Sequence, residues 1–434
     1  MKRPVVITLL VMALVLVCVG IGSVIYFATG FQTNNPFDKL NVSSIVEESK
    51  TLKVDAEKPL TLKVTDDAGD VTITGADVKT VQVKVVKTAY DSSQSRADAE
   101  VKNIKYTIEQ SGSTITLKYE LPKSMNFSNN VNTVDFIVTV PNETTVTVNN
   151  NMGEVSVTDT KGNVDIDNDF GEVMVENIEG ALTVKNSSGE VTATSVKAGK
   201  ADIDLQSSFG GITLEKASGA NITINSNSGT IEMNDVRATG ELVTKTDFGD
   251  TKFENGSANS LNIESNNGKV SLVKLKISKE LKVDDDFGEI ELEQASAGSY
   301  DLHTNSGGIT VDGAKNEIKA YTDFGNITIK NAVSVTLDLK TNSGTIEFSG
   351  SLGEGPHLVN SDFGEISFAL PADSKLNVDL KTDFGKISSD LPITVTLTES
   401  SNSDKDQIAG SINGGGGTLT AATNSGNIKI TAIK

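Results

Sequence analysis

Cysteine is almost absent from this sequence, since Cys18 is the only one in 434 residues. It lies inside a long apolar run near the N-terminus, so everything after that run has no thiol. This excludes disulfides, thiol catalysis and cysteine-ligated metal sites from the remainder of the chain. A lipid attached to Cys18 would favour a small residue before it, whereas Val17 stands there. We therefore predict that Cys18 is an ordinary buried thiol.

Histidine is scarce as well. The two histidines, His303 and His357, lie in no catalytic motif. No Gly-x-Ser-x-Gly elbow and no ordered Ser/His/Asp set occurs. The sequence thus predicts a protein that is not an enzyme, with no catalytic residue, no cofactor-binding residue, no metal-binding residue and no cofactor.

Positive charge is outweighed by negative charge. There are 38 Lys and Arg residues against 58 Asp and Glu, which gives a net charge of −20, and only three residues are arginine. So acidic a chain repels phosphates, and we predict no nucleic-acid partner. Tryptophan is absent and aromatic residues make up 5%. The core is therefore expected to consist of aliphatic side chains.

Glycine is plentiful, and it marks a repeat. Near-copies of Asp-Phe-Gly-x-Ile or Asn-Ser-Gly-x-Ile recur 18 to 21 residues apart, with a last copy after a longer interval. A repeat of about 19–20 residues predicts a β-solenoid, in which each unit stacks on its neighbours. The glycines are predicted to form a structural turn ladder, because a tight turn there would need positive φ and a Cβ would clash. They are Gly153, Gly171, Gly189, Gly210, Gly229, Gly249, Gly268, Gly288, Gly307, Gly325, Gly344, Gly364, Gly385 and Gly426.

Each unit contains two short alternating segments. After Gly171, Val173 and Val175 alternate with polar residues, and the alternation resumes in Ala181-Leu-Thr-Val-Lys. Alternation with period two predicts a strand with one buried face. We therefore expect an all-β, parallel β-solenoid with two strands and two turns in each unit, and with Val173, Ile212, Ile231 and Ile290 pointing inward.

A second regularity lies inside the first. The residue before glycine alternates between phenylalanine and a small residue, and the residue before that is usually Asp in the aromatic copies and Asn in the others. One unit in each coil would place Asp beside Asn, which lets an amide donate to a carboxylate. Two units in each coil would stack carboxylates on carboxylates, which repel. The pattern favours one unit in each coil.

The phenylalanines admit two interpretations. They either pack beneath the corner or form an exposed aromatic stripe for binding. Burying one gains roughly 2 to 3 kcal/mol, and exposing six in register creates an apolar patch that monomers avoid. We therefore predict burial of Phe170, Phe209, Phe248, Phe287, Phe324 and Phe363.

The aspartates of the aromatic copies admit a metal interpretation. A row of Asp and Asn offers the hard oxygen ligands that Ca²⁺ prefers. The period of 19 to 20 residues does not match the nine-residue calcium roll, however, and Asp and Asn are common turn residues. We therefore predict turn residues at Asp169, Asp247, Asp286, Asp323, Asp362 and Asp383, with Asp284-Asp-Asp286 as a local excess of acid.

The N-terminus is predicted to lie outside the solenoid. Lys2 and Arg3 precede an apolar run over residues 4–28, which is long enough to cross a bilayer as a helix. We expect an uncleaved transmembrane signal anchor, with residues 1–3 as a cytoplasmic tail and the bulk of the chain outside the cell membrane. Residues 29–50 are expected to form a linker.

The two ends of the repeat region depart from the pattern. Residues 51–141 are strand-rich without the strict repeat, and we predict a cap with one short helix over residues 92–103, behind Asp91 or Ser92. Residues 142–434 are predicted to form the solenoid. Residues 400–417 are polar and are expected to form a loop extruded from the last coils.

The run Phe136-Ile-Val-Thr-Val-Pro-Asn-Glu-Thr-Thr-Val-Thr-Val, the repeats and the closing Gly414-Gly-Gly-Gly417 with Asn424-Ser-Gly-Asn-Ile carry a resemblance. They resemble the bacterial β-strand-repeat "putative adhesin" family, a membrane-anchored domain of unknown function. The similarity covers residues 51–434. It implies the fold and a location behind a membrane anchor, and it supplies no catalytic motif.

The function predicted from these observations is a non-catalytic, extracytoplasmic, adhesin-like surface binding or structural module. Its expected partners are the membrane, through the N-terminal helix, and a surface protein or a cell-wall ligand. One alternative is an accessory or sensor protein of an envelope-stress system. A second alternative is a calcium-dependent β-helix that binds or cleaves glycans.

Overall fold

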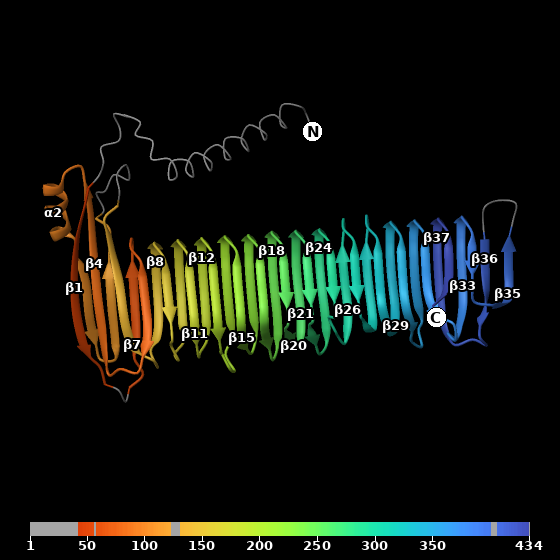
Figure 1. Ribbon diagram of the computed structural model, residues 1–434, viewed down its shortest axis with the longest axis horizontal. Helices are drawn as coiled ribbons and strands as arrows, with labels where there is room; N and C mark the ends of the chain where they lie inside the picture. Colours follow the sequence, from red (N-terminus) through yellow and green to blue (C-terminus); the bar gives the residue numbers. More distant parts are fainter. Residues whose placement is uncertain (1–41, 56–57, 123–130, 401–405, 434) are drawn as a thin grey trace, which may run out of the picture.

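The protein is a straight, elongated parallel β-solenoid, seen in a computed structural model that describes residues 42–55, 58–122, 131–400 and 406–433 (Figure 1). The predicted cytoplasmic tail, the signal anchor and most of the predicted linker lie outside these ranges. Among the residues described, no helix is long and apolar enough to cross a membrane.

Each coil contributes one strand to each of two facing layers, and in two coils the strand of the second layer is divided into two short strands. In one coil, β10 (Val164–Phe170) is followed by the glycine turn and then by β11 (Val173–Ile178). β10 pairs in parallel with β12, and β11 pairs in parallel with β13. One sequence unit therefore forms one coil, as the Asp and Asn pattern predicted.

The first layer holds the strands that end before the glycine turn, together with β5 (Tyr106–Ser111) and β6 (Thr114–Tyr119) at the N-terminal end and β36 (Asp406–Ile412) and β35 (Ile393–Ser400) at the C-terminal end. It comprises β5, β6, β2 (Thr61–Asp66), β8 (Thr145–Met152), β10, β12 (Leu182–Ser188), β14 (Ile203–Phe209), β16 (Ile222–Ser228), β18 (Glu241–Phe248), β21 (Ser260–Asn267), β24 (Glu280–Phe287), β26 (Ser299–Thr304), β28 (Lys315–Thr322), the second half of β29 (Ile327–Ser343), β31 (His357–Phe363), β37 (Gly417–Ser425), β33 (Leu376–Phe384), β36 and β35.

The second layer holds the strands that follow the turn, together with β1 (Val42–Lys53), β4 (Thr80–Asp91) and β7 (Thr133–Pro141) at the N-terminal end. It comprises β1, β4, β7, β3 (Val71–Ala76), β9 (Val155–Thr158), β11, β13 (Val191–Val196), β15 (Ile212–Gly219), β17 (Ile231–Ala238), β19 (Thr251–Glu254), β20 (Ser257–Ala258), β22 (Val270–Val273), β23 (Lys276–Ile277), β25 (Ile290–Glu293), β27 (Ile309–Asp312), the first half of β29, β30 (Ile346–Leu352), β32 (Ile366–Pro371), β38 (Ile428–Ile433) and β34 (Ile387–Ser389).

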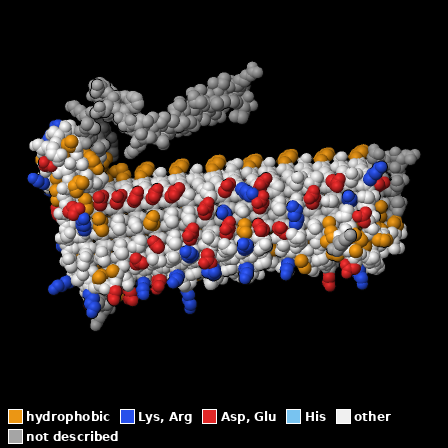
Figure 2. Space-filling view, in the orientation of Figure 1, with side chains coloured by type: hydrophobic (Ala, Val, Ile, Leu, Met, Phe, Trp, Pro, Cys, Tyr) orange, Lys and Arg blue, Asp and Glu red, His pale blue; other side chains and the backbone are white. Residues whose placement is uncertain are grey.

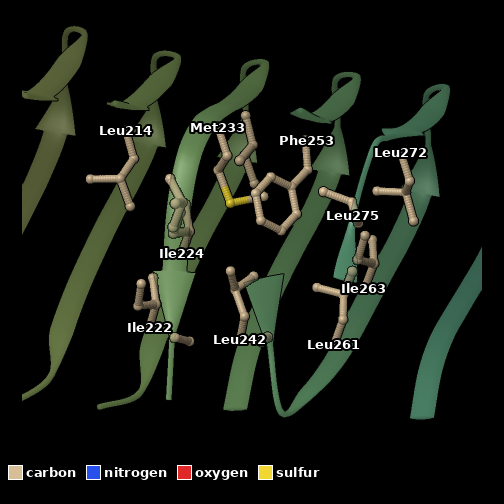
Figure 3. Close-up of a cluster of buried hydrophobic side chains, with 14 of the residues drawn as sticks. Leu214, Ile222, Ile224, Met233, Leu242, Phe253, Leu261, Ile263, Leu272 and Leu275 are labelled. Carbon is tan, nitrogen blue, oxygen red and sulfur yellow. The ribbon is translucent and has the colours of Figure 1, made fainter. Parts of the chain in front are cut away.

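The core lies between the two layers as continuous aliphatic ladders. The predicted inward residues Val173, Ile212, Ile231 and Ile290 are at most 1% exposed, which confirms the predicted register. Figure 3 shows the same arrangement in the middle of the rod, where side chains of both layers meet around Phe253. A slip of one residue would turn every one of these side chains to solvent, so this register is strongly specified.

The glycine ladder is a column in which backbones of successive coils touch. A Cβ on any of the fourteen predicted glycines would lie 1.8–2.3 Å from the carbonyl oxygen of the glycine in the preceding coil. The predicted positive φ is present from Gly153 to Gly268 and at Gly426, at 131–157°, but none is recorded from Gly288 to Gly385. Glycine is therefore required at all fourteen positions because the backbones of successive coils approach too closely for a Cβ. The positive φ is a second reason at only some of these positions. The column begins one coil earlier than predicted, because Gly69 occupies the same place before Gly153.

Three residues before each glycine, an inward polar side chain covers the ladder. Thr304, Thr322 and Thr341 donate hydrogen bonds to carbonyl oxygens of the glycine column at 3.0–3.2 Å. Asn150 donates to Asn168 and Asn168 to Asn186, which forms an amide ladder in earlier coils. These bonds satisfy turn carbonyls at the edge of an apolar core.

Asp285 places a carboxyl group in this polar column, as Asp66 does at the start of the column. Its carboxyl group is fully buried, and neither oxygen has a hydrogen-bond partner of normal geometry. Burial raises the pKa of Asp285 to about 6. Since this folded-state pKa lies above the ordinary value of 3.8, the stability that Asp285 provides is complete below about pH 4 and is lost as the pH rises through 6.

Replacing Asp285 with threonine is therefore expected to stabilise the protein at pH 8. A threonine hydroxyl would donate to the glycine column as Thr304 does, and the burial of a carboxylate would be avoided. The expected gain in unfolding free energy is up to about 3 kcal/mol at pH 8, from a pKa shift of about two units. Urea midpoints at pH 4 and pH 8 measure it. An equal midpoint for both proteins at pH 8 would contradict this account.

The N-terminal cap differs from the prediction in two respects. Residues 42–50, predicted as linker, belong to β1, which pairs antiparallel with β4 along its whole length. This pairing orders the segment, and it could not be predicted from the largely polar sequence of β1. The predicted helix is present as α2 (Gln94–Asn103), but Ser93 rather than Asp91 or Ser92 precedes it, without a side-chain capping bond.

The C-terminal end folds back into the stack. β37 lies between β31 and β33, and β38 lies between β32 and β34, so the last coil in sequence is inserted before the preceding one. The predicted loop over residues 400–417 is largely wrong, because residues 406–412 form β36, which pairs antiparallel with both β33 and β35. Pairing with neighbours on both sides orders a polar segment that shows little strand pattern.

Candidate functional site: the phenylalanine edge

The phenylalanines before the glycine turns are exposed, so the prediction that they are buried is wrong. Their exposed fractions lie between 60% and 68%. Phe384, which was not among the six phenylalanines predicted to be buried, belongs to the same row. We define the phenylalanine edge as Phe170, Phe209, Phe248, Phe287, Phe324, Phe363 and Phe384. The line of separate hydrophobic side chains along one long edge in Figure 2 follows the ends of these strands in Figure 1.

The exposure has a physical cause in the turn. Strand parity would point Phe170 inward after Val164, Ile166 and Asn168. The strand ends at this residue, and the contact between glycine backbones closes the coil just beyond it. Asn168 already fills the last inward place, where it donates to the carbonyl oxygen of Gly171 at 3.1 Å. The ring has no cavity to enter and extends into solvent.

Aromatic and small residues alternate along the whole edge in space. Phe170 pairs with Ser188, and Ser188 with Phe209. In sequence the alternation fails near the C-terminus, where Phe363 and Phe384 belong to consecutive units. The inserted β37 restores it, because Ser425 pairs with both of them. The edge therefore carries one phenylalanine on every second coil, about 9.6 Å apart, given about 4.8 Å between neighbouring strands.

A carboxylate lane runs beside the phenylalanine edge, one residue earlier in each strand. Asp247 and Asp286 each accept a hydrogen bond at 2.7 Å, from the side-chain amides of Asn266 and Asn305 in the next coil. Asn342 donates to Asp323 in the same way, and Asn424 donates to Asp362 at 3.2 Å. This confirms the predicted pairing of Asp with Asn. Neighbouring carboxylates lie at least two coils apart, which is about one Debye length or more at physiological salt, so their mutual repulsion is weak. We define the carboxylate lane as Asp169, Asp247, Asp286, Asp323, Asp362 and Asp383; before Phe209 this place is taken by Ser208.

The two histidines occupy structural positions. His303 contacts Asp284 at 2.8 Å and stacks on Tyr321, with ring centroids 5.1 Å apart. His357 is buried, accepts the backbone N–H of Leu337 at Nδ1 and contacts the carbonyl oxygen of Gly353 through Nε2. Burial lowers the pKa of His357, in keeping with a neutral ring.

The acidic excess at residues 284–286 separates into three environments. Asp284 faces His303 on the surface, Asp285 lies inside the polar column, and Asp286 belongs to the carboxylate lane. Within the described part of the chain, no group of three or more His, Cys, Asp or Glu residues is placed to hold a metal ion.

The chain belongs to the Toastrack family DUF4097, whose pattern matches residues 61–255 and again residues 254–431. The resemblance to a β-strand-repeat family of unknown function is thereby confirmed. No curated protein matches the sequence.

Three solved structures are similar to the chain. A "putative cell adhesion protein" from Clostridium sporogenes ATCC 15579 has 10% identity and a TM-score of 0.18, covering 90% of this chain and 100% of that one. A "putative adhesin" from Bacteroides fragilis NCTC 9343 has 12% identity and a TM-score of 0.19, covering 89% and 97%. A "putative lipid binding protein" from Parabacteroides distasonis ATCC 8503 has 12% identity and a TM-score of 0.20, covering 89% and 97%.

Proposed function

We propose that this protein is a non-catalytic, adhesin-like binding module that attaches to its partner along the phenylalanine edge. One observation carries the proposal: seven phenylalanines, each at least 60% exposed, lie in register along one side of a rigid rod. Exposed apolar rows of this size mark interaction surfaces in soluble domains. A rod built from stacked coils presents such a row over its full length without rearrangement.

The proposal is tested by replacing Phe209, Phe248 and Phe287 together with serine. Serine stands naturally at this place in alternate coils, and the rings are exposed, so the unfolding free energy should change by less than about 0.5 kcal/mol for each substitution. If each ring contributes about 1 to 2 kcal/mol on binding, attachment of the protein to whole cells should fall by at least about 100-fold.

A matched control replaces three exposed apolar residues that lie away from the edge. Met174, Val333 and Leu358 are 50%, 52% and 43% exposed. Their triple serine variant should attach as the unchanged protein does. Equal loss of attachment in both triple variants would argue against the phenylalanine edge, as would full attachment of the phenylalanine variant.

The location proposed for this module is the outer side of the cell membrane, behind the signal anchor predicted over residues 4–28. A reporter enzyme fused after Lys434 is expected to be active outside the cell, and the protein should remain in the membrane fraction at full mass. Fractionation with mass spectrometry measures both. Recovery of a shortened, soluble product from the medium would contradict the anchor.

A further inference from the structure

Two chemically different rows on this solenoid share one period. The phenylalanine edge repeats on every second coil, about 9.6 Å apart, and the carboxylate lane follows it at every ring except Phe209, where Ser208 stands in place of an aspartate. Phe248 follows Asp247 and Phe287 follows Asp286, and six of the seven rings have a carboxylate directly before them in the same strand. A ligand that uses both rows needs apolar faces and cationic groups that alternate with the same repeat.

The charge of the lane restricts the ligand. Asp247, Asp286 and Asp362 receive an amide hydrogen bond on Oδ1, which fixes each carboxylate and leaves it capacity for further donors. Lysine comes near the lane at Lys381, whose ammonium group is 3.9 Å from Asp383. With a net charge of −20, the chain attracts cations and repels phosphates and uronates.

We propose that the phenylalanine edge and the carboxylate lane together bind an extended β-1,4-linked glycan that carries free amino groups, that is, a glucosamine-containing chain. This inference rests on the proposed function and names the class of ligand for it. In such a chain each sugar is turned over relative to the last, so amino groups on one side recur once in every disaccharide. The length of that disaccharide is close to the period of about 9.6 Å.

Each part of the glycan has a counterpart in the protein. The apolar C–H faces of the pyranose rings pack against the phenylalanine rings, which supply flat hydrophobic area. The ammonium groups lie beside Asp247, Asp286 and Asp323, where charge-assisted hydrogen bonds form. An ammonium beside a phenylalanine face gains a cation–π contact as well.

Other occupants match fewer of these features. Anionic lipid surfaces and nucleic acids meet the carboxylate lane with the same sign of charge. A second copy packed antiparallel on the edge brings one carboxylate lane toward the other, because each lies on the same side of its ridge. A fully N-acetylated glycan has the same disaccharide repeat but lacks the ammonium groups that would pair with the carboxylate lane. Charge and period together favour the amino glycan.

The test uses the purified full chain and glucosamine oligosaccharides long enough to span several coils. Calorimetry compares them with fully N-acetylated oligosaccharides of equal length and with cello-oligosaccharides. We expect the glucosamine oligomer to bind at least about tenfold more tightly than either, with affinity falling as salt is raised. Equal affinity for all three, or no dependence on salt, would overturn the role of the carboxylate lane.

Two variants separate the rows. Asp247→Asn, Asp286→Asn and Asp323→Asn together place amides where alternate coils already have them. We expect this variant to lose the preference for the glucosamine oligomer, and the phenylalanine-to-serine triple variant to lose binding to all three glycans. Sedimentation of the protein alone checks for a second copy, and self-association that depends on the phenylalanines would overturn the glycan as occupant. If no oligosaccharide binds while attachment to cells still depends on the phenylalanine edge, this inference fails and the proposed function stands.

Discussion

Replacing Gly307 with alanine is expected to unfold the middle of the solenoid or to destabilise it by more than about 4 kcal/mol. The added Cβ would lie 1.8 Å from the carbonyl oxygen of Gly288 in the preceding coil. Neither the Cβ nor the carbonyl oxygen can move aside, because each is attached directly to a backbone that the parallel ladders hold in place. The melting transition followed by circular dichroism measures the effect.

The neighbouring residue supplies the control. A Cβ on Gly308 would lie 3.6 Å from the nearest atom, the carbonyl oxygen of Asn326, which is an ordinary van der Waals contact. Neither Gly307 nor Gly308 has a φ recorded in the left-handed region, so the comparison isolates the clash from backbone strain. Gly308→Ala is expected to melt within a few degrees of the unchanged protein. Equal melting of the two variants would show that the coils are not in backbone contact.

Replacing Asp66 with asparagine is expected to stabilise the protein strongly at neutral and alkaline pH. Asp66 begins the polar column and is 1% exposed. Burial raises the pKa of Asp66 to about 8. Its Oδ2 and the Oδ1 of Asn150, its partner in the parallel register, are both buried without a hydrogen-bond partner. An asparagine amide would donate to that oxygen and extend the ladder that runs from Asn150 to Asn168.

The sign and the pH range follow from the pKa. Because the folded-state pKa lies above the ordinary 3.8, the stability that Asp66 provides is complete below about pH 4 and is lost up to pH 8. Asp66→Asn should therefore raise the unfolding free energy by about 5 kcal/mol at pH 9 and by far less at pH 4. Urea midpoints across this range measure it. A midpoint that rises equally at both pH values would show that charge is not the cause.

The repeat could be predicted from the sequence because every coil has the same strands, the same turn and the same contacts with its neighbours. Alternation fixed which face of Val173 or Ile231 is buried, and a recurrent glycine indicated a place without room for a Cβ. The Asp and Asn pattern distinguished one unit from two in each coil, since only one arrangement pairs an amide with a carboxylate. These features are local in sequence or repeat at a fixed interval.

The exposure of the phenylalanine edge could not be predicted in this way. Parity along β10 places Phe170 on the same side as Val164 and Ile166, and the free energy of burial favours the interior. Exposure follows from the backbone contact at Gly171, which closes the coil. Because this contact is made by main-chain atoms, no side chain in the sequence indicates where the coil closes. The sequence did contain one indication of exposure. Ser188 lies beside Phe170 in the next coil, whereas a buried ladder of phenylalanines would favour apolar residues at the neighbouring positions.

Two other features depend on long-range pairing or on backbone shape. The insertion of β37 between β31 and β33 joins residues far apart in sequence. A second column, six residues after the glycines, has left-handed φ at residues as different as Asn177, Lys216 and Gln294. Lysine and glutamine have no preference for that conformation, so the requirement comes from the stacked coils.

Site-specific photocrosslinking on whole cells tests most directly whether the phenylalanine edge is the binding surface. A photoreactive phenylalanine analogue is placed at Phe248 in one protein and, in another, at the exposed Thr239, which lies in the turn just before the strand that ends at Phe248. We predict crosslinked products of cell-surface material from position 248 and none from position 239. Products from position 239 alone, or equally from both, would contradict the assignment of binding to the phenylalanine edge.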